Sequence, residues 1–422
     1  MTERPTTDIT FTSLDLPRPI LQGIEEAGFS HCTPVQAETL PLALAGTNVA
    51  GQAQTGTGKT AAFLIAAFHR MLTRPAPEGR KPTQPRTLIL APTRELAIQI
   101  ARDAATLGAH TGFRIALAYG GTGYVEQRRA LEEGVDVLIG TPGRLIDYFK
   151  QRVFDLKAVQ VAVLDEADRM FDLGFIKDVR YLLKHCPPPE RRLNLLFSAT
   201  LSWRVTELAY EQMDDPRLIR IEPERVTAER VRQAVYYPAT DEKIALLIGL
   251  LRQRDPRRTI VFANTKRATE QIADYLKANG FQAAVLSGDV PQRTRQRLLR
   301  QFSAGELPVL VATDVAARGL DIPDVSHVFN FDVPQDAEDY VHRIGRTARF
   351  GASGDAISFA CERYATALPD IEAYLGYKLP AEAITDDLLP QLTRPTRSRR
   401  SRGGPDRRGK GRGGRRPSKQ RA

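Results

Sequence analysis

Short apolar runs alternate with helical patterns along most of the 422-residue chain, from about Asn48 into the 360s. Parallel sheets with crossover helices produce this rhythm. The runs fall into two groups. The first comprises residues 48–52, 87–91, 114–119, 136–139, 159–164 and 193–197, and the second comprises 259–263, 283–286, 309–312, 327–331 and 356–360. The pattern predicts an α/β fold with two similar parallel sheets.

A charged stretch that contains Pro216 and Pro223 separates the two groups. Such a stretch is typical of a connection between domains. We therefore expect a first domain over residues 1–222, a linker over 223–232 and a second domain over 233–378. The helix that begins near Asp241 carries apolar residues at helical spacing, which we interpret as packing against a core.

The net charge of +10 is concentrated at the C-terminus. Residues 391–422 contain 13 basic residues and one acidic residue, so they carry +12 and leave the rest of the chain at −2. A tail rich in Arg, Gly, Pro and Ser buries too little apolar surface to fold. We expect residues 379–422 to be mostly disordered and to bind a polyanion, and a merely solubilising tail is the alternative.

Other features of the chain exclude several classes of protein. Its apolar runs fall far short of the roughly 20 residues that span a bilayer, and its acidic N-terminus does not resemble a secretory signal. The three cysteines, Cys32, Cys186 and Cys361, lie far apart without metal-ligand spacing. We therefore expect a cytoplasmic protein with reduced thiols, no membrane association and no zinc site.

A glycine-rich segment connects the first predicted strand to a helix, as a phosphate-binding loop requires. Its residues are Ala53, Gln54, Thr55, Gly56, Thr57, Gly58, Lys59 and Thr60. Backbone N–H groups of such a loop wrap phosphates, the lysine reaches the β and γ phosphates, and the Thr60 hydroxyl binds Mg²⁺. The generic motif begins with Gly where this chain has Ala53. A chance glycine-rich turn is the alternative.

An acidic motif follows the buried run of residues 161–164, and it contains Asp165, Glu166 and Asp168. Ligands of parallel α/β sheets bind at the carboxyl ends of the strands. Asp165 can hold Mg²⁺ through water, and Glu166 can polarise the water that attacks a γ-phosphate. An acidic helix cap is the alternative interpretation.

Together with further motifs, these residues resemble the DEAD-box RNA helicases from Phe11 to about Tyr374. The additional motifs are residues 32–36, 92–96, 120–121, 141–144, 198–200, 261–264, 312–321 and 342–349. The resemblance implies two tandem RecA-like domains that bind ATP and Mg²⁺ and hydrolyse ATP. Small departures are Ala348 and the Ser-Gly-Asp sequence at 287–289.

The resemblance also assigns residues to the nucleotide. Gln36 binds the adenine edge, which an amide can match by donating and accepting at once. Phe11 stacks on the adenine ring, and Asp321 contacts the ribose. The alternative role of Phe11 is that of an N-terminal residue that only packs against the domain. Arg343 and Arg346 act as arginine fingers on one stripe of a helix, with a surface salt-bridge stripe as their alternative. Since these residues lie on both domains, hydrolysis should require the domains to close.

The resemblance places RNA across both domains. The candidate contacts are Thr93, Arg94, Gly121, Thr141 and Arg144 in the first domain, and Gly288, Arg293, Arg295, Thr313 and Asp314 in the second. Hydroxyls, glycine N–H groups and arginines position phosphates without reading bases, so we expect weak sequence preference and local opening of short duplexes. Asp168, Ser198, Thr200 and His342 would couple hydrolysis to strand separation.

Details outside the motifs resemble the bacterial RhlB-type helicases, for example residues 117–121, 168–178 and 210–213. That branch implies a role in RNA degradation beside the endoribonuclease RNase E, in a degradosome complex. We expect a monomer outside such complexes. Two other hypotheses stay open. The chain could be an ATP-gated RNA clamp that serves as a scaffold for a nuclease, or a DNA translocase with the same two-domain core.

Overall fold

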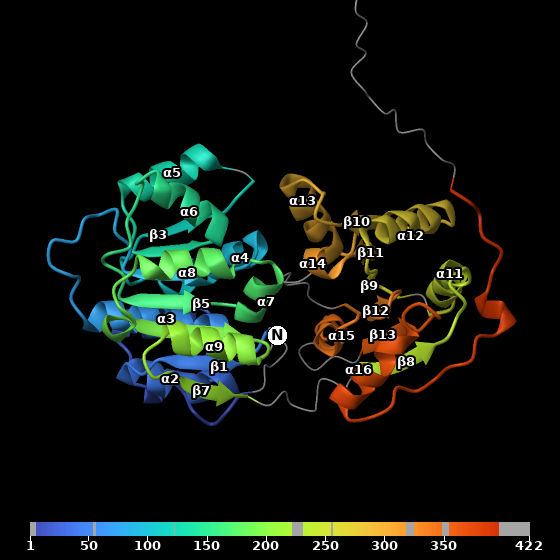
Figure 1. Cartoon of the computed structure of the whole chain (residues 1–422), viewed down its shortest axis with the longest axis horizontal. Helices are drawn as coiled ribbons and strands as arrows, with labels where there is room; N and C mark the ends of the chain where they lie inside the picture. The colour runs from blue at the N-terminus through green and yellow to red at the C-terminus, as the bar shows by residue number, and fades with distance from the viewer. Residues whose placement is uncertain are drawn as a thin grey trace, which may run out of the picture.

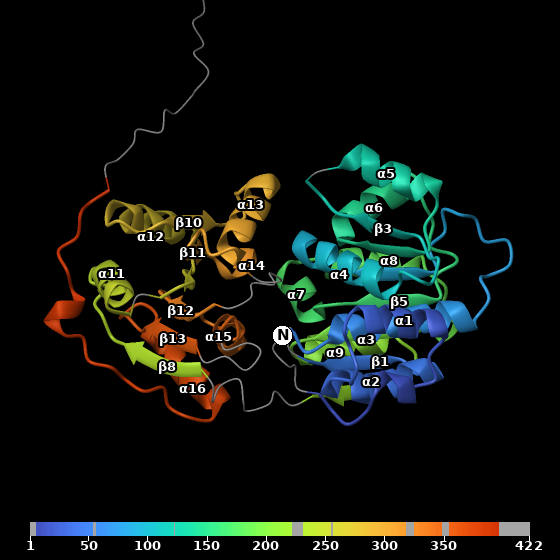
Figure 2. The same ribbon diagram turned by 180° about the vertical axis from the view of Figure 1, so that it is seen from behind.

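Two α/β domains lie side by side in the computed structural model of the chain (Figure 1). The structure describes residues 6–53, 56–121, 123–221, 231–254, 256–317, 325–347 and 354–395. Figures 1 and 2 both place helices α4 (Arg94–Leu107) and α7 (Ala167–Asp172) of the first domain opposite α13 (Gln292–Ser303), α14 (Asp314–Ala317) and α15 (Ala337–Ile344) of the second. The fold class expected from the sequence is confirmed.

The first domain is built on a seven-stranded parallel sheet of order β3-β4-β2-β5-β6-β1-β7. Its strands are β1 (Val49–Gln52), β2 (Thr87–Leu90), β3 (Ile115–Ala118), β4 (Val137–Gly140), β5 (Val161–Leu164), β6 (Leu193–Ser198) and β7 (Arg217–Arg220). Its other helices are η1 (Phe11–Ser13), α1 (Arg18–Glu26), α2 (Pro34–Ala45), α3 (Lys59–Thr73), α5 (Tyr124–Glu133), α6 (Pro142–Lys150), α8 (Ile176–Lys184), η2 (Pro189–Arg191) and α9 (Trp203–Gln212).

The second domain is built on a six-stranded parallel sheet of order β10-β11-β9-β12-β13-β8. Its strands are β8 (Val231–Tyr236), β9 (Thr259–Phe262), β10 (Ala283–Leu286), β11 (Val309–Ala312), β12 (His327–Asn330) and β13 (Gly354–Phe359). Its other helices are α11 (Lys243–Arg254), α12 (Lys266–Ala278), η4 (Ala365–Ala367), α16 (Leu368–Leu375) and η5 (Asp386–Leu388).

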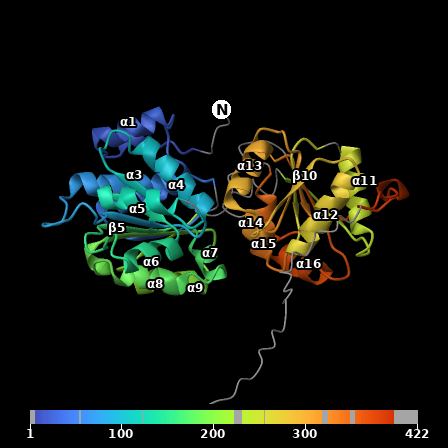
Figure 3. The same ribbon diagram turned by 90° about the horizontal axis from the view of Figure 1, so that it is seen from above.

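Helices cover both faces of each sheet (Figure 3). In the first domain, α1 to α4 pack on one face and α6, α8 and α9 on the other. In the second domain, α11 and α12 share one apolar cluster, whereas α13 to α16 contribute to clusters on the opposite face. Because strands buried on both faces must be apolar at almost every position, this arrangement explains the continuous apolar runs of the sequence.

Every strand expected from the apolar runs is present, but two further strands were missed. β7 and β8 lie inside the charged stretch that was interpreted as an interdomain connection, and each forms an edge of its sheet, next to β1 and β13 respectively. In β7, only Ile219 is buried and the two arginines are exposed. An edge strand needs few apolar residues, which is why the pattern did not reveal it. Most of the predicted linker, residues 223–230, lies outside the described residues.

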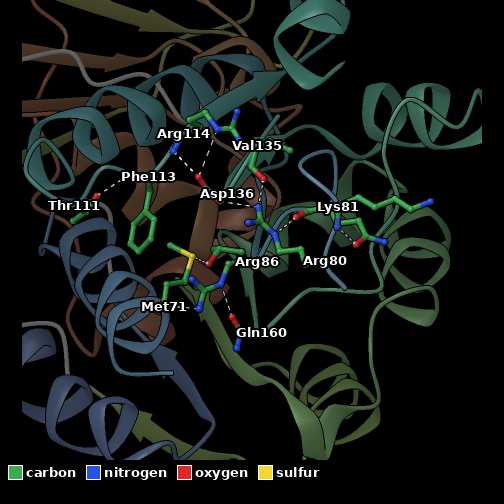
Figure 4. Close-up of polar contacts among 12 residues, drawn as sticks. Met71, Arg80, Lys81, Arg86, Thr111, Phe113, Arg114, Val135, Asp136 and Gln160 are labelled. Atoms are coloured by element: carbon green, nitrogen blue, oxygen red, sulfur yellow. Dashed lines mark hydrogen bonds and ion pairs between the residues drawn. The ribbon is translucent and has the colours of Figure 1, made fainter. Parts of the chain in front are cut away.

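Two arginines, the buried Arg86 and the partly buried Arg80, hold together the N-terminal ends of strands in the first sheet (Figure 4). Arg86 donates to Gln160 Oε1 at 2.6 Å and to the carbonyls of Met71 and Arg74 at 2.9 and 2.7 Å. Arg80 donates to Asp136 Oδ1 at 2.7 Å. These contacts satisfy backbone carbonyls and tie together the starts of β2, β4 and β5. This edge is therefore structural, and the sequence motifs lie at the opposite edge.

The packed part of the second domain extends beyond the boundary expected at residue 378. Leu388 is buried in the core beside α11, and Ala381 bridges to Val235 of β8. Gly249 allows this approach, because a Cβ there would lie 2.1 Å from the Leu388 carbonyl oxygen. Residues 379–395 thus pack on the domain, whereas residues 396–422 lie outside the described part of the chain. No helix among the described residues is long and apolar enough to cross a membrane.

Candidate nucleotide and nucleic-acid sites

The glycine-rich loop connects β1 to α3 as the sequence predicted. Gly56 and Gly58 have φ angles of +87° and +96°, a region that residues with a Cβ rarely adopt. Lys59 is buried at the start of α3, and its Nζ donates to the Ala53 carbonyl at 2.7 Å. A phosphate oxygen could replace that carbonyl as the acceptor. Thr60 lies in the first helical turn, whereas Gln54 and Thr55 lie outside the described residues.

Gln36 connects helix α2 to this loop. Its Oε1 accepts from the Thr33 backbone N–H at 2.8 Å, and its Nε2 donates to the Gly58 carbonyl at 3.0 Å. Any bond to an adenine edge would have to share or replace these partners. Phe11 is only 2% exposed and packs in the core of the first domain. Adenine recognition by both residues stays a prediction.

The acidic motif begins at the carboxyl end of β5. Asp165 is 2% exposed, and its Oδ1 accepts from the Glu166 backbone N–H at 3.0 Å. Burial raises the pKa of the Asp165 carboxyl to about 7, against the opposing charge of Lys59. A buried carboxylate and the Thr60 hydroxyl are hard oxygen donors of the kind that Mg²⁺ prefers, so the residues present fit this ion.

Glu166 is held in one orientation by the fold. It has a φ angle of +50°, which is uncommon for a residue with a side chain, and its Oε2 accepts from Arg169 Nη1 at 3.0 Å. Burial raises the pKa of the Glu166 carboxyl, but Arg169 and other nearby cations outweigh this effect and hold the pKa below its usual range. The cations besides Arg169 are Lys59 and Arg346. Glu166 is therefore ionised at neutral pH, as a residue that polarises water must be.

Sequence reasoning missed Arg169. Its position three residues after Glu166 on the following helix was the available signal, because side chains at that spacing face each other.

Of the residues expected to couple hydrolysis to strand separation, Asp168 and Ser198 are in direct contact. The Asp168 backbone N–H donates to Ser198 Oγ at 3.1 Å, and the Ala199 N–H donates to Asp168 Oδ2 at 3.2 Å. These bonds connect the acidic motif to the end of β6. Burial, with the Glu166 charge, raises the pKa of Asp168. Thr200 lies just beyond this junction.

A cavity of about 280 Å³ lies where these motifs meet the second domain. Lys59, Glu166, Asp168, Arg169 and Thr200 line it from the first domain, and Asp339, His342 and Arg346 line it from the second. The structure thus brings the lysine of the phosphate loop, the ionised glutamate and one of the two expected arginine fingers to one place. That combination of charges suits a triphosphate whose terminal group is being transferred.

Arg343 lies elsewhere, inside the second domain. Its guanidinium is almost fully buried and donates to both carboxylate oxygens of Asp314, at 2.6 and 2.7 Å, and to Asn264 Oδ1 at 2.8 Å. Helix α15 ends at Ile344, so Arg343 and Arg346 do not form the single stripe that the sequence suggested. Asp314, an expected RNA contact, is the partner in this ion pair. Asp321 lies outside the described residues.

A second buried pair joins the same network. Lys243 of α11 lies with its Nζ 2.5 Å from Asp332 Oδ1, and Asp332 Oδ2 accepts from the Asn264 N–H at 2.9 Å. Asn264 in turn accepts from Arg343. The network fixes the carboxyl ends of β9 and β12 relative to α15, and therefore the position of Arg346. Lys243 was not singled out from the sequence, where it reads as an ordinary helix residue.

A second cavity, of about 470 Å³, lies between the domains next to α4 and α13. Six of the ten expected RNA contacts line it, and they come from both domains. They are Thr93, Arg94, Thr141, Arg144, Gly288 and Arg295. Arg144 lies over the rings of Tyr124 and Tyr148, at 4.9 and 5.3 Å from their centroids.

The remaining four candidates are not among the lining residues of this cavity. Gly121 lies close behind it, because a Cβ there would come within 2.3 Å of the Arg94 guanidinium. Arg293 is exposed on the first turn of α13, Asp314 is paired with Arg343, and Thr313 is half-buried at the end of β11.

An ion pair crosses the boundary between the domains at the second cavity. Arg295 Nε lies 2.7 Å from Glu95 Oε1, without the alignment of a hydrogen bond, and both side chains are nearly buried. Arg295 also donates to the Ala316 carbonyl. Glu95 lies in the first turn of α4, next to Arg94, so this pair couples the two halves of the expected RNA track directly.

Comparisons with known proteins agree with this geometry. The DEAD/DEAH box helicase family matches residues 33–208, and the helicase conserved C-terminal domain matches residues 242–351. The chain is 60% identical over 398 residues to the ATP-dependent RNA helicase RhlB of Xanthomonas oryzae pv. oryzae, covering 94% of this chain and 69% of that protein. It is 56% identical to RhlB of Vibrio campbellii, covering 94% and 91% respectively.

Solved structures show the same arrangement. S. cerevisiae Dbp5 bound to RNA and ADP BeF3 matches with a TM-score of 0.77 and 32% identity, covering 90% of this chain and 96% of that one. Mss116p bound to ssRNA and AMP-PNP matches with a TM-score of 0.78 and 30% identity, covering 91% and 82%. The chain therefore belongs to the DEAD-box family of ATP-dependent RNA helicases, enzymes that hydrolyse ATP.

Proposed function

We propose that ATP and RNA bind cooperatively across the two domains and that ATP hydrolysis releases the RNA. The observation that supports this cycle is that each cavity is lined by both domains. One holds the phosphate-loop lysine with Arg346, and the other holds the candidate RNA contacts. Bringing the domains together therefore completes both sites in one movement, and separating them dismantles both.

In the first cavity, the phosphate loop and Lys59 bind the triphosphate. Thr60 and Asp165 would hold Mg²⁺, which offsets the negative charge of the phosphate oxygens. Glu166 orients and polarises the attacking water, and Arg346 stabilises the charge that develops on the transferred group. Arg343 acts by holding α15, rather than by touching the nucleotide.

In the second cavity, hydroxyls and arginines bind one RNA strand through its phosphates. Such contacts carry little sequence information, so the preference for sequence should be weak. A strand clamped in this way is separated locally from its complement, which opens short duplexes without long translocation. The bonds between Asp168 and the end of β6, together with His342, are the proposed link between the two cavities.

The decisive experiment measures ATP hydrolysis at fixed salt without nucleic acid, with single-stranded RNA and with single-stranded DNA, using Glu166→Gln as the blank. Stimulation by RNA alone supports the proposed cycle. Tight RNA binding with little stimulation would favour the RNA-clamp alternative, and equal stimulation by DNA would favour a translocase.

We further propose that the enzyme acts in the cytoplasm in RNA degradation, with RNase E as its partner, and is a monomer outside that complex. The resemblance to RhlB-type helicases supports this role. Co-purification of RNase E with the full-length chain, and a rise in RNA-stimulated turnover when RNase E is added, are the expected results. Absence of both would remove the partner from the proposal.

A further inference from the structure

Helix α13 carries an exposed basic stripe. The segment from Val290 to Gly305 contains four arginines and no acidic residue. Three of them, Arg293, Arg297 and Arg300, are exposed and lie four and three residues apart, so they share one face of the helix. The fourth, Arg295, points the opposite way and pairs with Glu95 across the domain boundary.

The stripe has no counter-charge within the described part of the chain. None of the side chains of Arg293, Arg297 and Arg300 forms an ion pair or a hydrogen bond with the residues that the structure describes. Helix α5, on the other side of the second cavity, differs in this respect. Its Arg128 and Arg129 pair with Glu132 and Glu133 at 2.8 and 2.7 Å. The positive charge on α13 is therefore available to an external anion.

Helix stability does not explain the stripe. Arginines four residues apart repel each other by a few tenths of a kcal/mol. Arg300, in the last turn, is favoured by the helix dipole, but Arg293 lies in the first turn, where a cation is disfavoured and acidic residues are absent. Because Arg293 destabilises the N-terminal end of the helix, binding of a ligand explains the stripe better than stabilisation of the fold does.

The helix that carries the stripe begins next to the second cavity. Gly288, Val290 and Arg295 line that cavity, so α13 begins at its rim. Figures 1 and 3 show α13 at the side of the second domain that faces the first. From Arg293 to Arg300 the helix rises about 10 Å, which gives the stripe the reach of a short stretch of nucleic-acid backbone. Guanidinium groups match phosphates in pairs of hydrogen bonds.

We propose that the outward face of α13 binds the phosphates of single-stranded RNA that continues beyond the second cavity. This inference rests on the proposed function, because it needs RNA to occupy that cavity. The face adds affinity for long RNA without adding sequence preference. It lets the enzyme favour extended single-stranded regions over short fragments that only fill the cavity.

The test measures the affinity of the wild type and of a double variant, Arg297→Gln with Arg300→Gln, for RNAs of two lengths. The probes are a short oligouridylate that fills only the cavity and one several times longer, each titrated over a range of salt concentrations with a non-hydrolysable ATP analogue. For the long RNA we expect about a tenfold loss of affinity at physiological salt and a decrease of about 1.4 in the slope of log K against log salt, from two lost phosphate contacts. The short RNA and ATPase activity without RNA should be unchanged.

Two controls separate charge at this face from other causes. Arg252→Gln with Lys277→Gln removes two exposed charges from α11 and α12, away from the cavity, and should leave both probes within about twofold. Arg297→Lys with Arg300→Lys keeps the charge and should retain most of the long-RNA affinity.

Equal affinity for long RNA in the double Gln variant and the wild type would overturn the proposal. An acidic protein surface would then be the expected ligand of the stripe. Equal losses for both probes would also overturn it, since that result places the effect in the cavity or in domain closure. Failure of the unsubstituted enzyme to bind the short RNA would instead contradict the proposed function.

Discussion

The ion pair between Glu95 and Arg295 should hold the closed arrangement of the domains. We consider Arg295→Ala, which removes the second-domain partner. The two side chains approach to 2.7 Å and are only 13% and 11% exposed, so water screens the pair weakly. They belong to different domains, and both return to water when the domains separate. In the closed arrangement, the substitution therefore loses the attraction of the pair and leaves the shielded Glu95 carboxylate without this counter-charge, whereas the open arrangement is little affected.

The size of the effect follows from that geometry. Close pairs of opposite charge across an interface couple by about 1.5–7 kcal/mol. We expect the lower part of that range, about 1.5–3 kcal/mol, because this pair lacks the alignment of a hydrogen bond. Since 1.4 kcal/mol corresponds to a factor of ten in an equilibrium constant, the closed state should become about 10- to 100-fold less favourable. The RNA concentration that half-stimulates ATP hydrolysis should rise by the same factor. Turnover at saturating RNA should change little, because Arg295 does not line the nucleotide cavity.

The assay is a double-mutant cycle with Arg295→Ala, Glu95→Ala and both together, read out as half-stimulating RNA concentration. Closure can be followed directly through Trp203, the single tryptophan of the chain, which is 70% exposed and lines the nucleotide cavity. A coupling energy of at least 1 kcal/mol is expected. If Arg295→Ala costs the same in the Glu95→Ala background as in the wild type, Arg295 acts on RNA alone and the reasoning about closure is wrong.

Glu166→Gln should reduce ATP turnover to background while RNA binding with ATP persists, and undiminished turnover would contradict the assignment of Glu166. Arg346→Ala should lower kcat with nearly unchanged ATP binding, whereas Arg343→Ala should destabilise the second domain by about 3–5 kcal/mol in urea unfolding, because it breaks the buried ion pair with Asp314. Equal Tm values for the two variants would contradict this distinction. Removing residues 396–422 should leave Tm unchanged and weaken RNA binding. Removing residues 384–422 should in addition lower Tm by several degrees, because Leu388 is then lost from the core. Equal Tm values for the two truncations would show that residues 384–395 do not stabilise the second domain.

Signals that lie close together in the chain could be recognised from the sequence. The apolar runs predicted eleven strands because a strand covered on both faces must be apolar along its own length. The phosphate loop and the acidic motif are each a few consecutive residues at the end of a strand, so their position in a parallel sheet followed directly. The same reasoning overlooked β7, whose edge position demands little apolar sequence. It also overlooked β8, in which Arg232 and Gln233 interrupt the apolar residues of a mostly buried strand.

The tertiary structure decided which charged residues meet. Arg343 and Arg346 looked equivalent in sequence, but the fold directs one to Asp314 inside the second domain and the other to the cavity beside Glu166. Glu95 and Arg295 are 200 residues apart and meet only because the two domains face each other. A side chain's partner depends on strand order and domain packing, which bring distant segments together. The sequence by itself therefore determined the fold class and the chemical groups available, and only the three-dimensional arrangement determined which of them act together.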